Sequence, residues 1–258
     1  MLAVLLSIAA AACFALSSLQ VSRVSQQVGA LQTVRWQMSL AFAMTAIAGT
    51  AVDGWQTVTA QSMLWLALSS VAAVMVGGLT YMAAIKVIGP RIFALFFTLS
   101  SPFALVLAYL FREERITLIQ GAGVALILAG IVLAILGPGD EAGQKRIQRL
   151  GLGIVLGLVT ALSQALGNLF SRPAMLDGVE PMTAIAIRSG LGSLFFMALL
   201  ALPRLRPAER LAVSDLRKIG LSALTGMFLG MSLLMAALAR GDFGIVSTLS
   251  STTPILIL

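Results

Sequence analysis

The sequence predicts an all-α membrane protein made of two inverted five-helix repeats, a ten-helix design of which about nine helices fall within the chain. Three observations support this prediction: the composition, the spacing of the apolar runs, and a match of the chain with itself. Of the 258 residues, 59% are hydrophobic and only 10% are charged, and the mean hydropathy is +1.00. A soluble domain carries about a quarter charged residues, so this chain requires a lipid bilayer as its solvent.

The composition also excludes several classes of function. The net charge of +7 comes from basic residues that stand singly or in pairs between apolar runs. This distribution is typical of loops at a membrane surface rather than of a nucleic-acid groove. The chain has no His and a single Cys, Cys13, so zinc, haem and disulfide frameworks are not expected. We therefore expect no metal, no cofactor and no nucleic-acid partner.

The apolar runs have the length of membrane-spanning helices. A hydrocarbon core of roughly 30 Å needs about 20 apolar residues per helix. In the first half of the chain, helices are predicted at 2–20, 31–51, 63–85, 91–111 and 117–137. In the second half, they are predicted at 151–171, 182–203 and 218–239, with a ninth from residue 244 to the end. The runs are continuous rather than alternating, so membrane-spanning strands are not expected.

The chain matches itself at an offset of about 153 residues. Residues 68–85 fall on 221–238 at this offset, so that two "MAA" segments coincide, and Arg35 falls on Arg188. Small residues also recur at four-residue spacing on the matching helices. Such ridges let helices approach closely in lipid, where no hydrophobic force drives them together.

This match divides the chain into a first repeat at 1–137, an inter-repeat loop at 138–150 and a second repeat at 151–258. Because five crossings are an odd number, the second repeat must enter the membrane from the opposite side. Inverted repeats of this kind occur in transporters, which bind substrate between the repeats near the midplane. The second repeat holds four of its five helices, so we expect the chain to stop before a tenth.

The segment at 100–137 carries the most specific motif. Pro102 begins it, the turn "FREER" follows at 111–115, and the next helix has the pattern G-x-x-L-I-x-x-G from Gly123 to Gly130. This order resembles the EamA-type permeases of the drug/metabolite transporter superfamily, although the turn has Arg-Glu where Leu-Gly is usual. The resemblance implies ten helices and the export or exchange of small metabolites.

Hydroxyl residues beside two prolines are candidates for the transport path. Pro102 removes a backbone donor and should bend its helix, and Pro254 holds the equivalent place in the second repeat. The neighbouring hydroxyls either line a polar cavity, which we prefer, or bond back to their own helix. The substrate-binding candidates here are Ser100, Ser101, Pro102, Thr252, Thr253 and Pro254.

Five further candidates lie inside predicted helices. Arg35 and Arg188 are the charges that lie well within them. Each either binds a substrate carboxylate or extends to the nearby interface and anchors its helix. Because both recur at the repeat offset, a shared structural role is preferred. Tyr81 is also a candidate, as are Gln164 and Asn168, which share one helix face and either bond a neighbouring helix or meet solute.

The acidic residues bear on coupling. All ten lie in predicted loops or at helix edges, whereas a proton-coupled antiporter usually needs a buried carboxylate. Facilitated diffusion or exchange is therefore favoured over obligate proton antiport. An intramembrane enzyme is not expected either, because no nucleophile–base pair is visible.

We therefore predict a multi-pass transporter of the cell (inner or plasma) membrane, acting as a monomer. It would export or exchange small amphipathic metabolites, such as amino acids or related compounds, by alternating access. Its expected partners are a small-molecule substrate and the lipid bilayer. The alternatives are a non-transporting membrane assembly or sensory subunit, and a multidrug exporter. Loop charges place the N-terminus outside, but the resemblance implies a cytoplasmic N-terminus, which we prefer.

Overall fold

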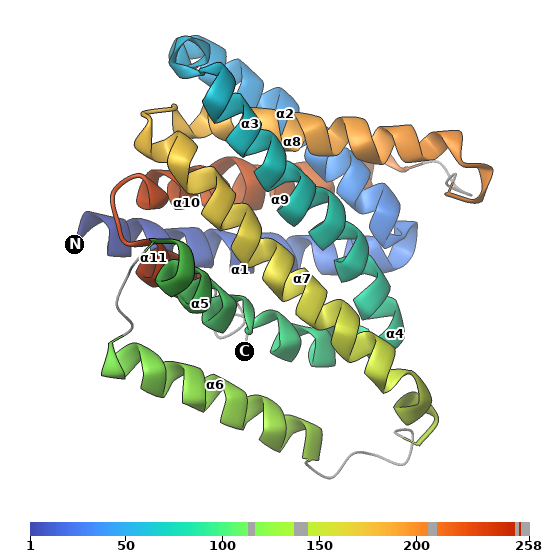
Figure 1. The fold of residues 1–258 in the computed structure, drawn as a ribbon. Helices are drawn as coiled ribbons and strands as arrows, with labels where there is room; N and C mark the ends of the chain where they lie inside the picture. Colours follow the sequence, from blue (N-terminus) through green and yellow to red (C-terminus); the bar gives the residue numbers. More distant parts are fainter. Residues whose placement is uncertain (113–116, 137–143, 206–210, 251–252, 254–258) are drawn as a thin grey trace.

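The structure is a computed structural model that describes residues 1–112, 117–136, 144–205, 211–250 and 253. Every regular element within these ranges is a helix, which confirms the all-α prediction. Figure 1 shows the helices packed as one bundle, with α6 (Leu118–Leu136) at its edge. Leu118 and Leu126 of this helix are 93% and 76% exposed, so α6 presents apolar side chains outward, as a helix in contact with lipid does.

The first half of the chain contains the five predicted helices, two of them interrupted. Its elements before α6 are α1 (Leu2–Val28), α2 (Ala30–Ala51), η1 (Gly54–Thr57), α3 (Ala60–Ser69), the π-helical η2 (Ser70–Val76), α4 (Gly77–Phe97) and α5 (Ser100–Arg112). The third predicted helix comprises α3, η2 and the beginning of α4, and the fourth comprises the end of α4 and α5. The third and fourth predicted helices are separated at Gly89. Its φ of 77° is not helical and lies in the left-handed region that favours glycine.

The second half repeats this pattern. Its elements are α7 (Gln144–Leu176), α8 (Pro181–Ala198), η4 (Leu199–Ala201), η5 (Pro203–Leu205), α9 (Val213–Ser222), the π-helical η6 (Ala223–Gly230), α10 (Met231–Leu238) and α11 (Phe243–Ser250). The eighth predicted helix comprises α9, η6 and α10. The prediction of a loop over 138–150 is wrong from Gln144 onward, where α7 begins. The sequence there, "QKRIQRL", consists mostly of good helix formers.

Five stretches of the described residues are long and apolar enough to cross a membrane. They are Leu2–Val21, Ala60–Gly89, Gly151–Leu176, Pro181–Ala201 and Val213–Leu238, with shorter apolar helices at Leu95–Phe111 and Gln120–Ala129. α2 is not among them because its first two turns carry four polar residues. All four are buried in the protein: Gln32, Thr33, Arg35 and Gln37.

Pro102 interrupts the fourth predicted helix, as expected. α4 ends at Phe97 and α5 begins at Ser100. Because Pro102 has no N–H to donate to the Thr98 carbonyl, this carbonyl accepts the N–H of Ser101 instead, at 3.2 Å. The carbonyl that the proline leaves without its helical donor is therefore satisfied within the chain.

The two halves contact each other through pairs of long helices. α1 packs on α9, η6 and α10, and α7 packs on α3, η2 and α4, while α2 packs on α8. Glycines permit close approach at two of these contacts. A Cβ atom on Gly226 would collide with Ser17 of α1, and one on Gly167 of α7 would collide with Ala73 of η2. Ala73 and Gly226 lie 153 residues apart, so these two close contacts involve matching positions of the third spans in the two halves.

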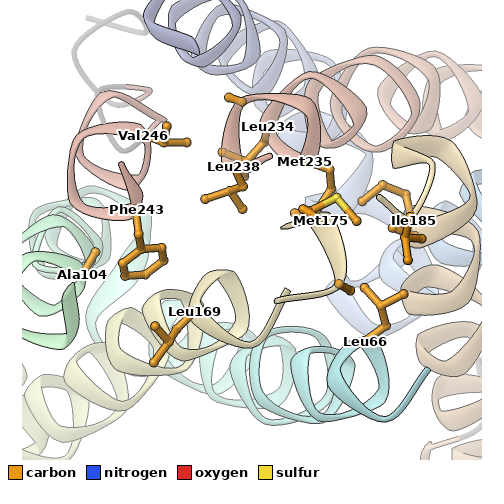
Figure 2. Packing of buried hydrophobic residues seen from close by; sticks show 14 of the residues in the cluster. Leu66, Ala104, Leu169, Met175, Ile185, Leu234, Met235, Leu238, Phe243 and Val246 are labelled. Carbon is orange, nitrogen blue, oxygen red and sulfur yellow. The ribbon is translucent and has the colours of Figure 1, made fainter. Parts of the chain in front are cut away.

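The largest buried apolar cluster lies where α1, α3, α5, α7, α8, α10 and α11 meet. Figure 2 shows its side chains approaching one another from these separate helices. Leu66 comes from α3, Met175 from α7, Ile185 from α8, and Leu234 and Met235 from α10. The cluster fixes the positions of the helices that carry the buried polar residues described next.

Candidate functional site

Two fully buried serine pairs connect the halves of the chain inside the bundle, and a third pair, Ser39 with Ser193, is partly buried, with its hydroxyl oxygens 2.7 Å apart. Ser17 of α1 and Ser222 of α9 bring their hydroxyl oxygens to 2.7 Å, and the Ser17 hydroxyl donates to the Ser222 carbonyl at 2.9 Å. Ser69 of α3 and Ser171 of α7 are also 2.7 Å apart. Ser222 lies 153 residues after Ser69, and Ser171 lies 154 residues after Ser17. Ser69 and Ser222 therefore occupy equivalent positions, and each donates its hydroxyl to a carbonyl in the first helix of the other half, that of Gly167 or of Ser17. Their hydroxyl partners are one turn out of register, because Ser171 lies one turn after Gly167, the residue that meets η2 as Ser17 meets η6.

Each pair lies where an α-helix gives way to a π-helix. Ser69 ends α3 immediately before η2, and Ser222 ends α9 immediately before η6. π-Helical segments are rare and frequently occur at functional sites. The hydroxyl of Ser69 also bonds the carbonyl of Gly167 at 2.7 Å, so a third-span residue is held directly against the backbone of α7.

Gln37 of α2 adds an amide to one of the pairs only. Its Nε2 donates to the Ser222 hydroxyl at 2.8 Å, within the buried interior. The position 153 residues later is Gly190, which offers no side chain. On that side of the bundle, Ser70 donates its hydroxyl to the carbonyl of Arg188 at 2.9 Å instead. The polar contacts of the two halves are therefore similar but not identical.

Arg35 and Arg188 both end inside the protein. Arg35 of α2 is 3% exposed and Arg188 of α8 is 2% exposed. Both side chains are therefore covered by neighbouring helices, and the anchoring of their helices at the membrane interface stays a prediction. Arg35 Nε donates to the carbonyl of Phe196 in α8, at 3.1 Å, and thereby joins α2 to α8.

Arg188 has the fewest polar partners for its charge. Its Nη1 lies 3.8 Å from the Met235 sulfur, a weak acceptor, and its Nε and Nη2 have no partner among the described residues. The nearest carboxylate along α8 is its N-cap, Glu180, whose oxygens already accept the N–H groups of Met182 and Thr183. A buried charge without a partner is costly, so this position favours an anion that binds from outside the chain.

Asn168 of α7 is a second buried group with unused capacity. It is 4% exposed, and no residue that the structure describes bonds its Oδ1. Asn168 follows Gly167, whose carbonyl accepts the hydroxyl of Ser69. Ser70, which follows Ser69 in the third span, donates its hydroxyl to the carbonyl of Arg188. Asn168 and Arg188 therefore flank the same turn of the third span. Gln164, one turn before Asn168, is half-buried.

The remaining predicted candidates do not join this set. Tyr81 is 38% exposed and packs edge-on against Phe93, with ring centroids 4.9 Å apart. Ser100 and Ser101 are buried at the start of α5, and the hydroxyl of Ser101 has no partner in the described ranges. Thr253 bonds the carbonyls of Ser250 and Ala11 through its hydroxyl, at 3.0 and 3.4 Å. Thr252 and Pro254 lie outside the described residues.

Sequence reasoning missed the residues that form the polar contacts between the halves. They include Ser17, Gln37, Ser70, Ser171 and Arg188 through its backbone carbonyl, together with Ser69 and Ser222. The repeat offset does pair Ser69 with Ser222, but as small residues that let helices approach and not as polar contacts. Gln37 has no counterpart in the second half, and its partner is 185 residues away in the chain, so no local pattern indicated it.

Comparison with known proteins places the fold and the family. The model of the EamA-like transporter family matches residues 1–136 and 151–258. A solved structure, described only as a crystal structure of a protein, is 16% identical with a TM-score of 0.77, and the match covers 99% of this chain and 85% of that chain. Identity this low shows the fold alone. A search of curated proteins gave no match. The match of the family model over most of the chain shows that this protein belongs to the EamA-like transporter family, whose members are multi-pass membrane transporters of small molecules rather than enzymes.

Proposed function

We propose that this chain moves small amphipathic metabolites, such as amino acids or related compounds, across the cell membrane by alternating access of two inverted repeats, 1–137 and 151–258. The observation that supports this most strongly is the equivalent placement of Ser69 and Ser222 in the two serine pairs. Each pair joins the first helix of one repeat to the third span of the other. The solute is moved without chemical conversion, so the proposal includes no catalytic residue.

Equivalent contacts on two sides of a site suit alternating access, because one contact can open while the other stays closed. The two states then differ by few interactions and have similar free energies. The segments η2 and η6 begin 153 residues apart, directly after Ser69 and Ser222. A π-helix has weaker constraints on its hydrogen bonds than a long α-helix, so we assign the change in helix register or bend to these two segments.

The mode of transport we propose is facilitated diffusion or exchange by a monomer. The five acidic residues among the described part of the chain are Asp53, Asp177, Glu180, Asp215 and Asp242, and all lie between long helices or at their ends. None is placed to carry a proton through the middle of the bundle. The gradient of the solute itself then sets the direction of flux.

Flux in proteoliposomes tests the proposal. We expect counterflow of labelled leucine or N-acetyl-leucine into vesicles that contain the protein, and none into empty vesicles. Transport of tetraphenylphosphonium in place of both would favour a multidrug exporter. If the folded protein moves none of the three compounds, the transport proposal fails and a non-transporting membrane subunit becomes the better interpretation.

Paired cysteines test the alternating contacts directly. In a Cys13→Ala background, one variant carries Ser17→Cys with Ser222→Cys, and a second carries Ser69→Cys with Ser171→Cys. The native hydroxyls are 2.7 Å apart in both pairs, so both pairs are close enough to form disulfides on oxidation. We expect each disulfide alone to stop flux and reduction to restore it. Unchanged flux with either disulfide fully formed would contradict the mechanism.

A further inference from the structure

We propose that Arg188 binds the carboxylate of an amphipathic monocarboxylate, whose apolar part lies against Met235 and the apolar cluster beside it. The inference rests on the proposed transport function and names the chemical class of its substrate. Four features of the described residues support it: the free edge of the guanidinium, the position of the nearest carboxylates, the adjoining methionine, and the contrast with Arg35.

The free edge of the guanidinium is the one that pairs with carboxylates. Nε and Nη2 lie on the same side of the planar group, and their N–H bonds are parallel. This fork matches the two oxygens of a carboxylate. Within the described part of the chain these two nitrogens of Arg188 have no partner, while Nη1, on the other side, faces the sulfur of Met235 at 3.8 Å. The side chain is 2% exposed, so both free donors point into the protein.

The chain supplies no described carboxylate for this fork. Glu180 is two turns before Arg188 in α8, about 12 Å along the helix axis at 1.5 Å per residue. Both of its oxygens are already engaged at the start of the helix. Asp53 precedes η1, Asp177 precedes Glu180, and Asp215 and Asp242 stand at the starts of α9 and α11. The charge of Arg188 therefore requires an anion that is not part of these elements, and a bound substrate can provide it.

Met235 supplies the apolar side of the site. It is fully buried and belongs to the cluster in which Leu66, Met175 and Ile185 meet (Figure 2). A methionine side chain is unbranched and adapts its shape to varied apolar groups. Because the same residue contacts both the guanidinium and the cluster, a carboxylate held by Arg188 places its hydrocarbon part against Met235. A ligand with an anionic end and an apolar body satisfies both.

Arg35 does not offer the same site, although it occupies the equivalent position. Its Nε donates to the carbonyl of Phe196 at 3.1 Å. The fork of Arg35 is therefore half used in joining α2 to α8, and its Nη2 has no partner among the described residues. We assign carboxylate binding to Arg188 and a positioning role between helices to Arg35.

Binding to the purified protein in detergent tests the inference without any measurement of flux. The probes are N-acetyl-L-leucine and its uncharged isostere N-acetyl-L-leucinamide, and the readout is the rise of the unfolding temperature with ligand concentration. We expect the carboxylate to raise the unfolding temperature of the wild-type protein. We expect the amide to bind with at least about tenfold lower affinity, a difference of ~1.4 kcal/mol in binding free energy. Equal effects of the two probes, including no effect of either, would overturn the inference.

Three variants show whether Arg188 is responsible. Arg188→Met should remove the preference for the carboxylate, and Arg188→Lys should keep part of it, because lysine retains the charge but not the fork. Arg240→Gln is the matched control: Arg240 is an exposed arginine that bonds the Ala236 carbonyl, and its replacement should leave the preference intact. A preserved preference in a folded Arg188→Met protein would refute the assignment.

Stability without ligand separates binding from a structural role. Replacement of an arginine with a structural role would lower the stability of the protein. Replacement of an unpaired buried charge by methionine can leave the stability unchanged or raise it. We therefore expect Arg188→Met to unfold at the same or a higher temperature than the wild type, and a clearly lower temperature would count against the inference. Carboxylate binding without flux would remove the transport proposal alone, and flux without carboxylate preference would remove this inference alone.

Discussion

The hydroxyl of Ser222 is expected to contribute more stability than the equivalent hydroxyl of Ser69. In Ser69→Ala, the bonds of 2.7 Å to Ser171 and to the Gly167 carbonyl are lost, but Ser171 keeps its own bond to that carbonyl at 2.9 Å. No buried group is left without a partner. Single hydrogen bonds between membrane helices average about 0.6 kcal/mol and reach about 1.7 kcal/mol. We therefore expect a loss of about 1 kcal/mol.

Ser222→Ala has an additional consequence. Ser17 keeps its bond to the Ser222 carbonyl at 2.9 Å, but Gln37 Nε2 loses its acceptor. Gln37 is 9% exposed, and an unsatisfied buried donor costs about 1–3 kcal/mol. The total expected loss is about 2–3 kcal/mol, roughly twice to three times that of Ser69→Ala.

Reversible unfolding in mixed micelles measures both losses, and a double-mutant cycle identifies their origin. Gln37→Met removes the amide, and in that background Ser222→Ala should cost about 1 kcal/mol, like Ser69→Ala. The coupling between residues 37 and 222 should then be about 1–2 kcal/mol. The reasoning is refuted if Ser222→Ala costs no more than Ser69→Ala, or if the effects at 37 and 222 simply add.

Three further outcomes are expected. Gly226→Ala should destabilise the protein by about 1–3 kcal/mol in the same unfolding measurement, because the added Cβ lies 2.7 Å from the Ser17 Cβ; Gly151→Ala, where nothing lies within 4 Å, is the control and should cost nothing. Glu180→Ala should cost about 1 kcal/mol, since it removes the N-cap bonds of 2.9 and 2.7 Å to Met182 and Thr183, and unchanged stability would contradict this capping role. Counterflow in proteoliposomes should proceed at the same rate with and without an imposed pH gradient, and a strict requirement for the gradient would exclude exchange without proton coupling.

The sequence predicted the helical elements well where the physical cause was local. Apolar runs of about 20 residues placed the spans, and the break between the third and fourth spans falls at Gly89, inside the predicted loop "KVIGPR". Pro102 interrupts its helix because it lacks an N–H, which follows from the residue itself. The start of α7 at Gln144 was missed because a charged, helix-forming segment between repeats has the same composition as a polar loop.

The candidate site was less predictable, because its contacts join residues far apart in the chain. The positions of Arg35 and Arg188 inside helices were predicted, but neither the burial of their side chains in the protein nor their hydrogen bonds followed from the sequence. Arg35 meets Phe196, 161 residues away, and Ser17 meets Ser222, 205 residues away. The π-helical form of η2 and η6 was also not indicated, since their residues are ordinary helix formers and the form depends on how neighbouring helices pack.

The repeat offset is a better guide to the scaffold than to the chemistry. Equal offsets correctly relate Ser69 to Ser222 and Ala73 to Gly226, where the role is to let two helices meet. They do not relate Arg35 to Arg188 in the same way, because Phe196 provides a backbone acceptor for one, while the other faces Met235. A solute has no internal symmetry of its own, so a site for one carboxylate requires one free guanidinium edge rather than two. If the scaffold is built from two repeats but has a single anion site, Arg35 and Arg188 should have different partners, as they do.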